Sequence, residues 1–384
     1  MKRFIFILLI GYFLISCTDS EKYSYQLSQL EDWSVPLDTL TSNISFQVRS
    51  IQLNGKLYVA MYSRNLHAIN LWNIDSKKKE FTIPLKKDGQ DGIYRLTSYY
   101  IKAMDSVFVI PTYHKQIYLI DFNGHVKNKF VLDKKEVAEQ KENEIDKMDF
   151  LGDMYTPVQI IGNHMLIGTI SSEFGGLDPK FSKFPIGVTY NLKTSALNSK
   201  FMFFPETYLN KNFGYHNNVY YSDVDISRKN ILISFPVDDK IYLRDINGKL
   251  LKQIEANSDY LDIHFSALKG KGQSVTEKYF LDNPSFDRIL SDPFRKVYYR
   301  FALQKYEGQQ NVPTAMFSSF KPLSVIILNE QFEKIGETLL PANKHFIFNA
   351  FVGKKGLYIS NAHPNNPEND ENKLSFTCYQ LVKK

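Results

Sequence analysis

Cysteine and tryptophan are scarce in this chain, with two of each among 384 residues. Two cysteines cannot form the framework of a small disulfide-rich protein, and 19 glycines without a three-residue period exclude collagen. The sequence also lacks a Gly-x-Ser-x-Gly elbow, a phosphate-binding glycine loop and a His-Glu-x-x-His motif. What is present is the composition of a folded protein, 43% hydrophobic and 23% charged.

The N-terminal residues predict an export signal. A basic head, Met1 to Arg3, precedes an apolar run at residues 4–15, which is shorter than the roughly 20 residues that span a bilayer. The following Leu14-Ile15-Ser16-Cys17 resembles a bacterial lipobox, whose cysteine thiol receives lipid. We therefore expect a lipoprotein signal peptide at residues 1–16, lipidation of Cys17 and a lipidated tether at residues 17–22. The alternative is a secretory signal that ends in cysteine by chance.

The residues after this signal predict a cellular location. Asp19 and Glu21 resemble acidic signals that send such lipoproteins to the cell surface. We expect an outer membrane lipoprotein, facing the periplasm or the surface, that contacts the membrane through its N-terminal lipid. Because lipid would occupy Cys17, Cys378 has no disulfide partner, and its alternating segment predicts a buried thiol in a strand.

One hairpin pattern recurs along the chain. Each copy has two runs of alternating apolar residues joined by a short turn, and the six copies lie at residues 46–60, 97–110, 158–170, 219–235, 286–301 and 345–360. A second hairpin follows each copy. It is clearest at Ile117 to Gly124 and at Ile241 to Gly248, where six of eight positions are identical and both segments end in the turn dipeptide Asn-Gly.

Four antiparallel strands repeated six times predict an all-β fold, a six-bladed β-propeller of four-stranded blades. The sixth repeat has only three strands, so we expect residues 23–30 to supply the missing outer strand and close the ring. The propeller domain would span residues 23–384. Two β-sandwich domains, or a seventh blade hidden at residues 259–284, are the alternatives.

The connections divide the predicted propeller into two unlike faces. The Asn-Gly turns belong to one face, and the long segments belong to the other: 133–154, 171–185, 205–217, 259–284, 304–322 and 361–373. Long loops on a rigid scaffold commonly carry binding sites. We expect the channel mouth beneath these loops, an exposed helix at residues 133–148, and either a lid or a packing role for residues 259–284.

The lipobox, the hairpin repeat, residues 86–93 and residues 292–301 together resemble a family of uncharacterised Bacteroidetes lipoproteins. That family carries a domain of unknown function and is related to six-bladed, TolB-like propellers. The resemblance covers nearly the whole mature chain. It implies the fold and an envelope location, and it supplies no activity and no catalytic residues.

Polar residues on the predicted inner strands are the candidate ligand-binding residues: Arg49, Tyr99, Gln159, Tyr221, Asp223, Arg288 and Asn349. If they converge on the channel axis, they form a small mixed-charge pocket suited to an acidic or hydroxyl-rich ligand. The alternative is that they fill the channel and satisfy one another.

Other site classes find little support. His67, His114 and Asp238 lack the close spacing of metal ligands, so we expect no metal and no cofactor. The adjacent carboxylates Asp238 and Asp239 would point to opposite faces of a strand, which excludes an acid/base dyad. No basic stripe with interleaved aromatic residues occurs, so nucleic acid is not an expected partner.

These observations favour a monomeric, non-catalytic binding or scaffold module that captures an unknown protein or glycan through its loop-rich face. Fold alone does not fix function. The alternative is an enzyme, a hydrolase or lyase acting in the channel, with Ca2+ as a possible helper ion. No catalytic residue is assigned.

Overall fold

The computed structural model describes residues 23–45, 47–89, 91–111, 116–132, 148–151, 156–171, 178–308, 312–313 and 316–384. The predicted signal peptide, Cys17 with its tether, His114 and nearly all of the helix expected at residues 133–148 lie outside these ranges. In the described part, the elements are β-strands, two α-helices, α1 (Gln273–Asp282) and α2 (Phe317–Phe320), and two 3-10 helices, η3 (Pro179–Lys183) and η4 (Glu206–Tyr208).

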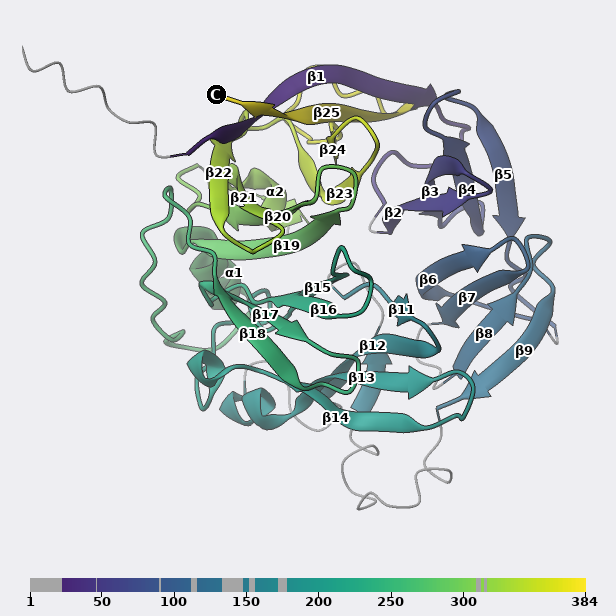
Figure 1. The fold of residues 1–384 in the computed structure, drawn as a ribbon, viewed down its shortest axis with the longest axis horizontal. Coiled ribbons are helices and arrows are strands. Elements are labelled where there is room, and N and C mark those ends of the chain that lie inside the picture. Colours follow the sequence, from purple (N-terminus) through teal and green to yellow (C-terminus); the bar gives the residue numbers. More distant parts are fainter. Residues whose placement is uncertain are drawn as a thin grey trace, which may run out of the picture.

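Four sheets are separate blades (Figure 1). The first contains β2 (Val48–Leu53), β3 (Lys56–Ser63), β4 (Ala68–Asn73) and β5 (Lys79–Pro84). The second contains β6 (Leu96–Ala103), β7 (Ser106–Pro111), β8 (Gln116–Ile120) and β9 (Val126–Val131). The third contains β10 (Met148–Leu151), β11 (Gln159–Ile161), β12 (His164–Ser171), β13 (Pro185–Asn191) and β14 (Leu197–Phe203). The fourth contains β15 (Tyr221–Val224), β16 (Ile231–Ser234), β17 (Lys240–Arg244) and β18 (Leu250–Glu255).

The remaining eight strands form one continuous sheet in the order β19-β20-β21-β22-β1-β25-β24-β23. Their bounds are β19 (Ser285–Asp292), β20 (Val297–Leu303), β21 (Leu323–Asn329), β22 (Lys334–Leu339), β1 (Tyr25–Pro36), β25 (Lys373–Lys383), β24 (Leu357–Ser360) and β23 (Phe346–Val352). All five sheets surround a common centre (Figure 1).

The expectation of a six-bladed propeller is therefore wrong: the propeller arrangement has four separate blades, and one eight-stranded sheet completes it. The physical reason lies at the start of β1, where Tyr25 pairs in parallel with Gly336 of β22 while the rest of β1 pairs antiparallel with β25. A Cβ atom on residue 336 would lie 2.3 Å from the Tyr25 carbonyl oxygen, so glycine permits this junction.

The N-terminal strand closes the arrangement. Residues Tyr25 to Pro36 pair with Lys373 to Lys383, which confirms the predicted pairing of the first mature segment beside the last strand. Trp33 of β1 is 1% exposed, and its Nε1 donates a hydrogen bond of 2.8 Å to the carbonyl oxygen of Ile74, after β4. β1 thus joins the two ends of the chain to the first blade.

The Asn-Gly turns of the second and fourth blades explain the identical segments there. Gly124 and Gly248 have φ angles of 78° and 89°, which favour glycine. A side chain there would also collide with the preceding blade, because a Cβ would lie 2.1 Å from the Pro84 carbonyl oxygen and 2.6 Å from that of Phe201. The repeated turn therefore also sets how closely neighbouring blades approach.

The core lies between sheets. One apolar cluster joins the first and second blades through residues such as Tyr58, Leu71 and Val109, and comparable clusters follow around the ring. The cluster around Trp33 also contains Cys378, which is fully buried in β25 as predicted. Burial of large aliphatic and aromatic side chains between sheets is the main source of stability.

The long segment at residues 259–284 forms α1 and contains no strand among its residues, all of which the structure describes. Phe280 and Leu281 of α1 pack with Val312 and Phe317. This segment is therefore packed against its neighbours, and it does not form a seventh blade.

Candidate functional site

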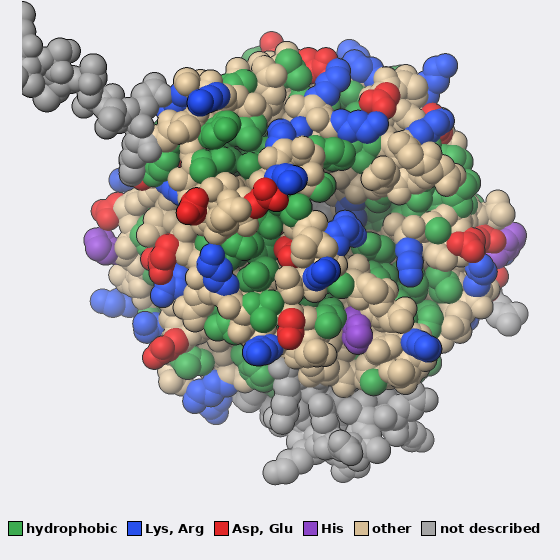
Figure 2. All heavy atoms as spheres, in the orientation of Figure 1, with side chains coloured by type: hydrophobic (Ala, Val, Ile, Leu, Met, Phe, Trp, Pro, Cys, Tyr) green, Lys and Arg blue, Asp and Glu red, His purple; other side chains and the backbone are tan. Residues whose placement is uncertain are grey.

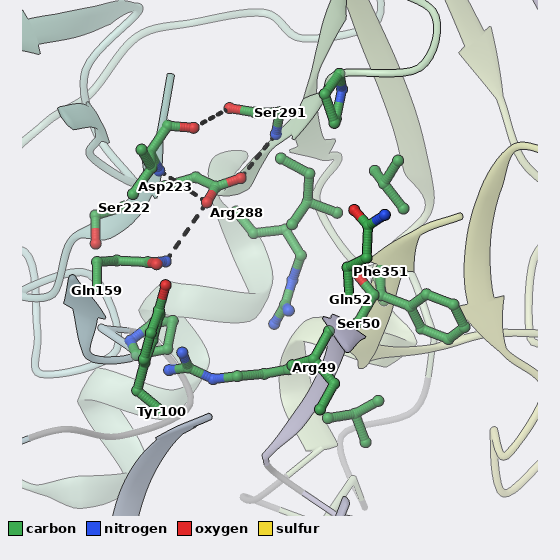
Figure 3. Close-up of a pocket in the computed structure, with 18 of the residues that line it drawn as sticks. Arg49, Ser50, Gln52, Tyr100, Gln159, Ser222, Asp223, Arg288, Ser291 and Phe351 are labelled. Carbon is green, nitrogen blue, oxygen red and sulfur yellow. Dashed lines mark hydrogen bonds between the residues drawn. The ribbon is translucent and has the colours of Figure 1, made fainter. Parts of the chain in front are cut away.

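The innermost strands enclose a cavity of about 500 Å³ at the centre of the molecule (Figure 3). Its wall comes from β2, β6, β11, β15, β19 and β23 and from the turns that follow some of them. The polar and charged wall residues are Gln47, Arg49, Ser50, Gln52, Ser98, Tyr100, Lys102, Gln159, Ser222, Asp223, Asp225, Arg228, Arg288 and Ser291. Four of these carry a positive charge and two carry a carboxylate, so the wall is net cationic.

The cavity reaches the turn face of the molecule. Its wall includes Gln52 and Lys102 near the ends of β2 and β6, Arg228 in the turn after β15, and Phe294 in the turn after β19. Figure 2 shows a hollow near the middle of this face, and α1 and α2 are drawn as distant parts in the same orientation (Figure 1). The cavity thus has an opening on the turn face, and the expected mouth beneath the long loops stays a prediction.

Phe348 forms part of the opposite end of the cavity wall. Its ring belongs to an apolar cluster with Phe346 and Ala362, against which Ile44 and Met316 pack. This cluster lies at the start of β23, toward the loop-rich face. Phe348 is the member of this cluster that lines the cavity.

Arg49 extends from β2 toward the second and third blades. Its Nη1 donates a hydrogen bond of 2.7 Å to the Val158 carbonyl oxygen, and its guanidinium carbon lies 5.8 Å from the centre of the Tyr99 ring. Its Nη2 is buried and has no hydrogen-bond partner among the described residues. Burial lowers the pKa of Arg49, while Tyr99, Tyr100 and Asp223 act in the opposite direction.

Arg288 enters the cavity from an irregular stretch of β19. The register between β19 and β20 shifts between Phe286 and Ile289, and such bulges redirect side chains. Arg288 Nη1 donates to the Phe348 carbonyl oxygen at 3.1 Å, and Nε lies 3.3 Å from Asp287 Oδ1. Within the described part of the chain, Nε and Nη2 make no hydrogen bond, although both are buried.

Asp223 of β15 lies across the cavity from Arg49 (Figure 3). Its Oδ2 accepts a hydrogen bond from the Ser291 amide at 2.7 Å, and its Oδ1 accepts from the Val224 amide at 2.8 Å and from Gln159 Nε2 at 3.5 Å. Burial raises the pKa of Asp223 to about 6, although these amides and the nearby Arg228 and Arg49 lower it. The carboxyl group is therefore protonated more readily than an ordinary aspartate, and its Oδ2 can accept a further hydrogen bond.

Neutral polar groups complete the wall. Ser222 Oγ and Gln47 Oε1 are buried and have no hydrogen-bond partner among the residues that the structure describes. Ser291 Oγ donates to the Val224 carbonyl oxygen at 2.6 Å, which fixes the turn after β15 against β19. Tyr100 adds a phenol ring beside Arg49 and Gln159 (Figure 3).

The structure brings four of the seven candidate residues into this wall: Arg49, Gln159, Asp223 and Arg288. The other three lie behind it. The Tyr99 hydroxyl donates to the Gln47 carbonyl oxygen at 3.0 Å, and the Tyr221 hydroxyl donates to Asp287 Oδ2 at 2.8 Å. Asn349 is 0% exposed, and neither polar atom of its amide has a hydrogen-bond partner in the described part of the chain.

Strand alternation explains part of these differences. Ser98, Tyr100 and Ser222 line the cavity, whereas their neighbours Tyr99 and Tyr221 point toward the adjacent blade. Sequence reasoning missed Ser222, Ser291 and Tyr100. Strict alternation would place Ser222 and Asp223 on opposite faces of β15. Both residues contribute to the wall, so alternation starting from Asp223 would not have found Ser222.

The loop-rich face is held by buried polar contacts. Lys321, after α2, is 2% exposed, and its Nζ donates to the carbonyl oxygens of Phe280 and Asn283 at 2.9 and 2.7 Å and to Ser285 Oγ at 3.0 Å. Burial lowers the pKa of Lys321 to about 7. These contacts fix α1 and α2 to the start of β19.

Metal ligands do not cluster in the described part of the chain, where no three His, Cys, Asp or Glu side chains are grouped to hold an ion. His67 is held by the Tyr62 hydroxyl at 2.9 Å and the Ile93 carbonyl oxygen at 2.7 Å. Asp238 accepts hydrogen bonds from Thr207 and Tyr242. Both residues therefore have structural contacts of their own.

Comparison with known families identifies the chain. The model of a domain of unknown function, DUF4221, matches residues 24–339. The chain belongs to the DUF4221 family. Among curated proteins, none matches it.

A solved structure supports the fold of this DUF4221 protein. A member of the same family from Bacteroides vulgatus is 24% identical, with a TM-score of 0.79 over 95% of this chain and 100% of the other. A Bacteroides fragilis protein is 11% identical over 94% of this chain and 95% of the other, and its TM-score of 0.49 is too low to support an argument. Among the described residues, no helix is long and apolar enough to cross a membrane.

Proposed function

We propose that this DUF4221 protein is a lipid-anchored, non-catalytic binding module of the bacterial cell envelope, and that its central cavity holds the ligand. The observation that carries this proposal is a set of buried hydrogen-bonding groups in the cavity wall, Arg49 Nη2, Arg288 Nη2 and Ser222 Oγ, that make no hydrogen bond within the described chain. Leaving such groups unsatisfied costs about 1–3 kcal/mol each. A ligand that bonds to them offsets that cost.

The shape of the cavity supports binding of a small molecule or of the end of a longer chain. Its volume of about 500 Å³ falls within the range of small-molecule sites. Its polar groups come from several sheets that pack firmly on one another, so their positions are set before a ligand arrives. A glycan end fits this description better than a folded protein does.

A tryptophan placed in the wall tests the position of the site. Ser50 lines the cavity from β2, and Ser50→Trp should fill it, whereas Lys56→Trp on the exposed end of β3 should not. We expect a compound from a panel of sugars, sugar acids and peptides to raise the melting temperature of the natural chain and of Lys56→Trp, and to have no effect on Ser50→Trp. Equal binding to both variants would place the site elsewhere.

The same panel addresses the alternative function. If the protein is a hydrolase or lyase, a bound compound should be converted during prolonged incubation, with or without Ca2+. We expect each ligand to be recovered unchanged. A new product that forms with the natural chain and not with Ser50→Trp would favour the enzyme.

The proposed anchor rests on the lipobox at Leu14 to Cys17 and on the acidic residues Asp19 and Glu21. Multiple acyl chains hold a protein stably at a membrane. Cys17→Ser should therefore move the protein from the outer membrane fraction to a soluble fraction. Protease treatment of intact cells then distinguishes a surface-facing from a periplasmic location.

A further inference from the structure

We propose that the ligand is a hydroxylated carboxylic acid, such as a uronic acid, whose carboxylate binds to Arg49 and Arg288 and whose hydroxyls bind to Asp223 and Ser222. This inference deepens the proposed function and rests on it. It adds the chemical class of the ligand and the role of each side chain.

The two arginines define the acidic end of the ligand. Arg49 and Arg288 come from β2 and β19, which both contact β23, and their side chains point into the same cavity (Figure 3). Each uses Nη1 on a backbone carbonyl oxygen and has a buried Nη2 without a hydrogen-bond partner in the described chain. Guanidinium groups with unused donors bind carboxylates well, because the bonds are charge-assisted.

The carboxylates near these arginines limit the charge of the ligand. Asp287 lies behind Arg288, with an oxygen 3.3 Å from Nε, and Asp223 lies in the wall itself. The two arginines are therefore partly neutralised already. A ligand with one negative charge suits this balance, whereas a phosphate with two charges would be repelled by Asp223 and Asp287.

The other wall residues would bind the hydroxyl groups of the ligand. Asp223 Oδ2 accepts one backbone hydrogen bond in the described chain, which leaves it able to accept another from a hydroxyl. Ser222 Oγ can donate or accept, and Gln159 Nε2 makes only a long bond of 3.5 Å to Asp223. Phe348 and Phe351 in the wall offer apolar surface to the C–H groups of a sugar ring.

Calorimetric titration at pH 7 tests the class of ligand. The probes are D-galacturonate and D-glucuronate, the neutral sugars galactose and glucose, and acetate as a carboxylate without hydroxyls. Hydrogen bonds to charged groups contribute roughly 1.5–3 kcal/mol, so we expect a uronate to bind at least about tenfold more tightly than its neutral sugar and than acetate. Equal binding of the neutral sugar would overturn the inference.

Substitutions then test the two arginines. Arg49→Gln and Arg288→Gln should each weaken uronate binding at least about tenfold, because each removes a charge-assisted bond. Arg49→Lys and Arg288→Lys keep the charge without the planar fork and should recover part of the affinity. Arg64→Gln, an exposed arginine between β3 and β4, is the matched control and should bind like the natural chain. Unchanged binding in both glutamine variants would also overturn the inference.

The outcomes separate this inference from the proposed function. If neutral sugars bind as tightly as uronates and Ser50→Trp abolishes their binding, the ligand is not an acid but the cavity is still the binding site. If Ser50→Trp leaves uronate binding intact, the uronate binds outside the cavity. Thermal unfolding of each variant shows whether it is folded, and a failure of every uronate to bind the folded natural chain would disprove the acid.

Discussion

Asp223 is the cavity side chain whose charge changes most readily with pH. Burial raises the pKa of its carboxyl to about 6, whereas the ordinary value in an unfolded chain is about 3.9. The folded protein therefore keeps this proton between about pH 4 and pH 6, where the unfolded chain has lost it. The resulting stabilisation is complete below about pH 4 and is lost as the pH rises through 6.

Asp223→Asn should remove that pH dependence. Because asparagine does not ionise, the variant should gain stability relative to the natural chain as the pH rises from 4 to 7. Urea midpoints measured at each pH give the difference, with the exposed Asp75→Asn as the control. A difference that stays constant across this range would contradict the raised pKa.

If the ligand is an acid, the natural chain should also bind it more tightly at pH 5 than at pH 7.

Arg300 of β20 is the buried charge on which the packing of the fourth blade depends. It is 0% exposed, and its guanidinium carbon lies 3.6 Å from the centre of the Phe286 ring. Its donors reach Ser234 Oγ at 3.0 Å and the carbonyl oxygens of Asp238 and Asp239 at 2.6 and 2.8 Å. One side chain thus satisfies several buried acceptors between β16 and β17.

Arg300→Met should lower the free energy of unfolding by about 3–5 kcal/mol, since it leaves those acceptors without a donor. The free energy of unfolding of Arg300→Lys should lie between those of the natural chain and Arg300→Met, because an ammonium group cannot reach all of these acceptors. Chemical denaturation at pH 7 measures the change, and exposed Arg64→Met should change it little. A loss below about 1 kcal/mol would show that water replaces the guanidinium.

At the level of single residues, the sequence predicted part of the cavity. It placed Arg49, Asp223 and Arg288 on inner strands, and they line the wall. It failed for Tyr99 and Tyr221, whose hydroxyls bond to neighbouring segments, and for Asn349 of β23. The register of β23 against β24 shifts between Phe346 and Ala350, so the alternation of side chains breaks where Asn349 lies.

Strand β1 closes the arrangement of sheets. It pairs with β25 along its length and touches β22 at its start, and Trp33 bonds to Ile74 beside the first blade. Trp33→Ala should therefore destabilise the whole protein by about 3–5 kcal/mol. Trp33→Phe keeps most of the buried area and loses the hydrogen bond, so it should cost about 1 kcal/mol.

Urea denaturation of both Trp33 variants provides the measurement. Leu30→Ala, an exposed position on the same strand, is the control and should unfold like the natural chain. If Trp33→Ala leaves the midpoint unchanged, β1 does not contribute to closing the molecule.

Strand positions were predictable from local patterns. The expected hairpin at residues 158–170 became β11 and β12, and the one at residues 286–301 became β19 and β20. Alternation and turn residues are local signals, and they suffice for hairpins. The joining of β22 to β1 connects residues more than 300 positions apart and depends on the space at Gly336, which no local pattern records.

In the whole molecule, the cavity mouth and the start of the first strand lie on the same side. Tyr25 begins β1 beside Lys383 and Gly336, near the turn from β21 to β22. From Cys17 to Tyr25 there are 25 − 17 = 8 residues, which reach at most about 28 Å. If Cys17 carries lipid, the turn face and the cavity mouth should face the membrane.

Cysteine labelling on vesicles tests this orientation. Lys56→Cys lies on the turn face and Glu368→Cys on the loop between β24 and β25, and both positions are exposed. With the lipidated protein bound to phospholipid vesicles, a bulky maleimide should label Lys56→Cys more slowly than Glu368→Cys. Without the lipid the two rates should be similar. Equal rates on vesicles would contradict the orientation.

A crystal structure of the mature chain with D-galacturonate tests the central claim most directly. The account predicts the sugar acid in the central cavity, with its carboxylate within hydrogen-bond distance of both Arg49 and Arg288 and a hydroxyl on Asp223. A sugar acid bound among the loops of the opposite face, or one in the cavity whose carboxylate points away from both arginines, would contradict it.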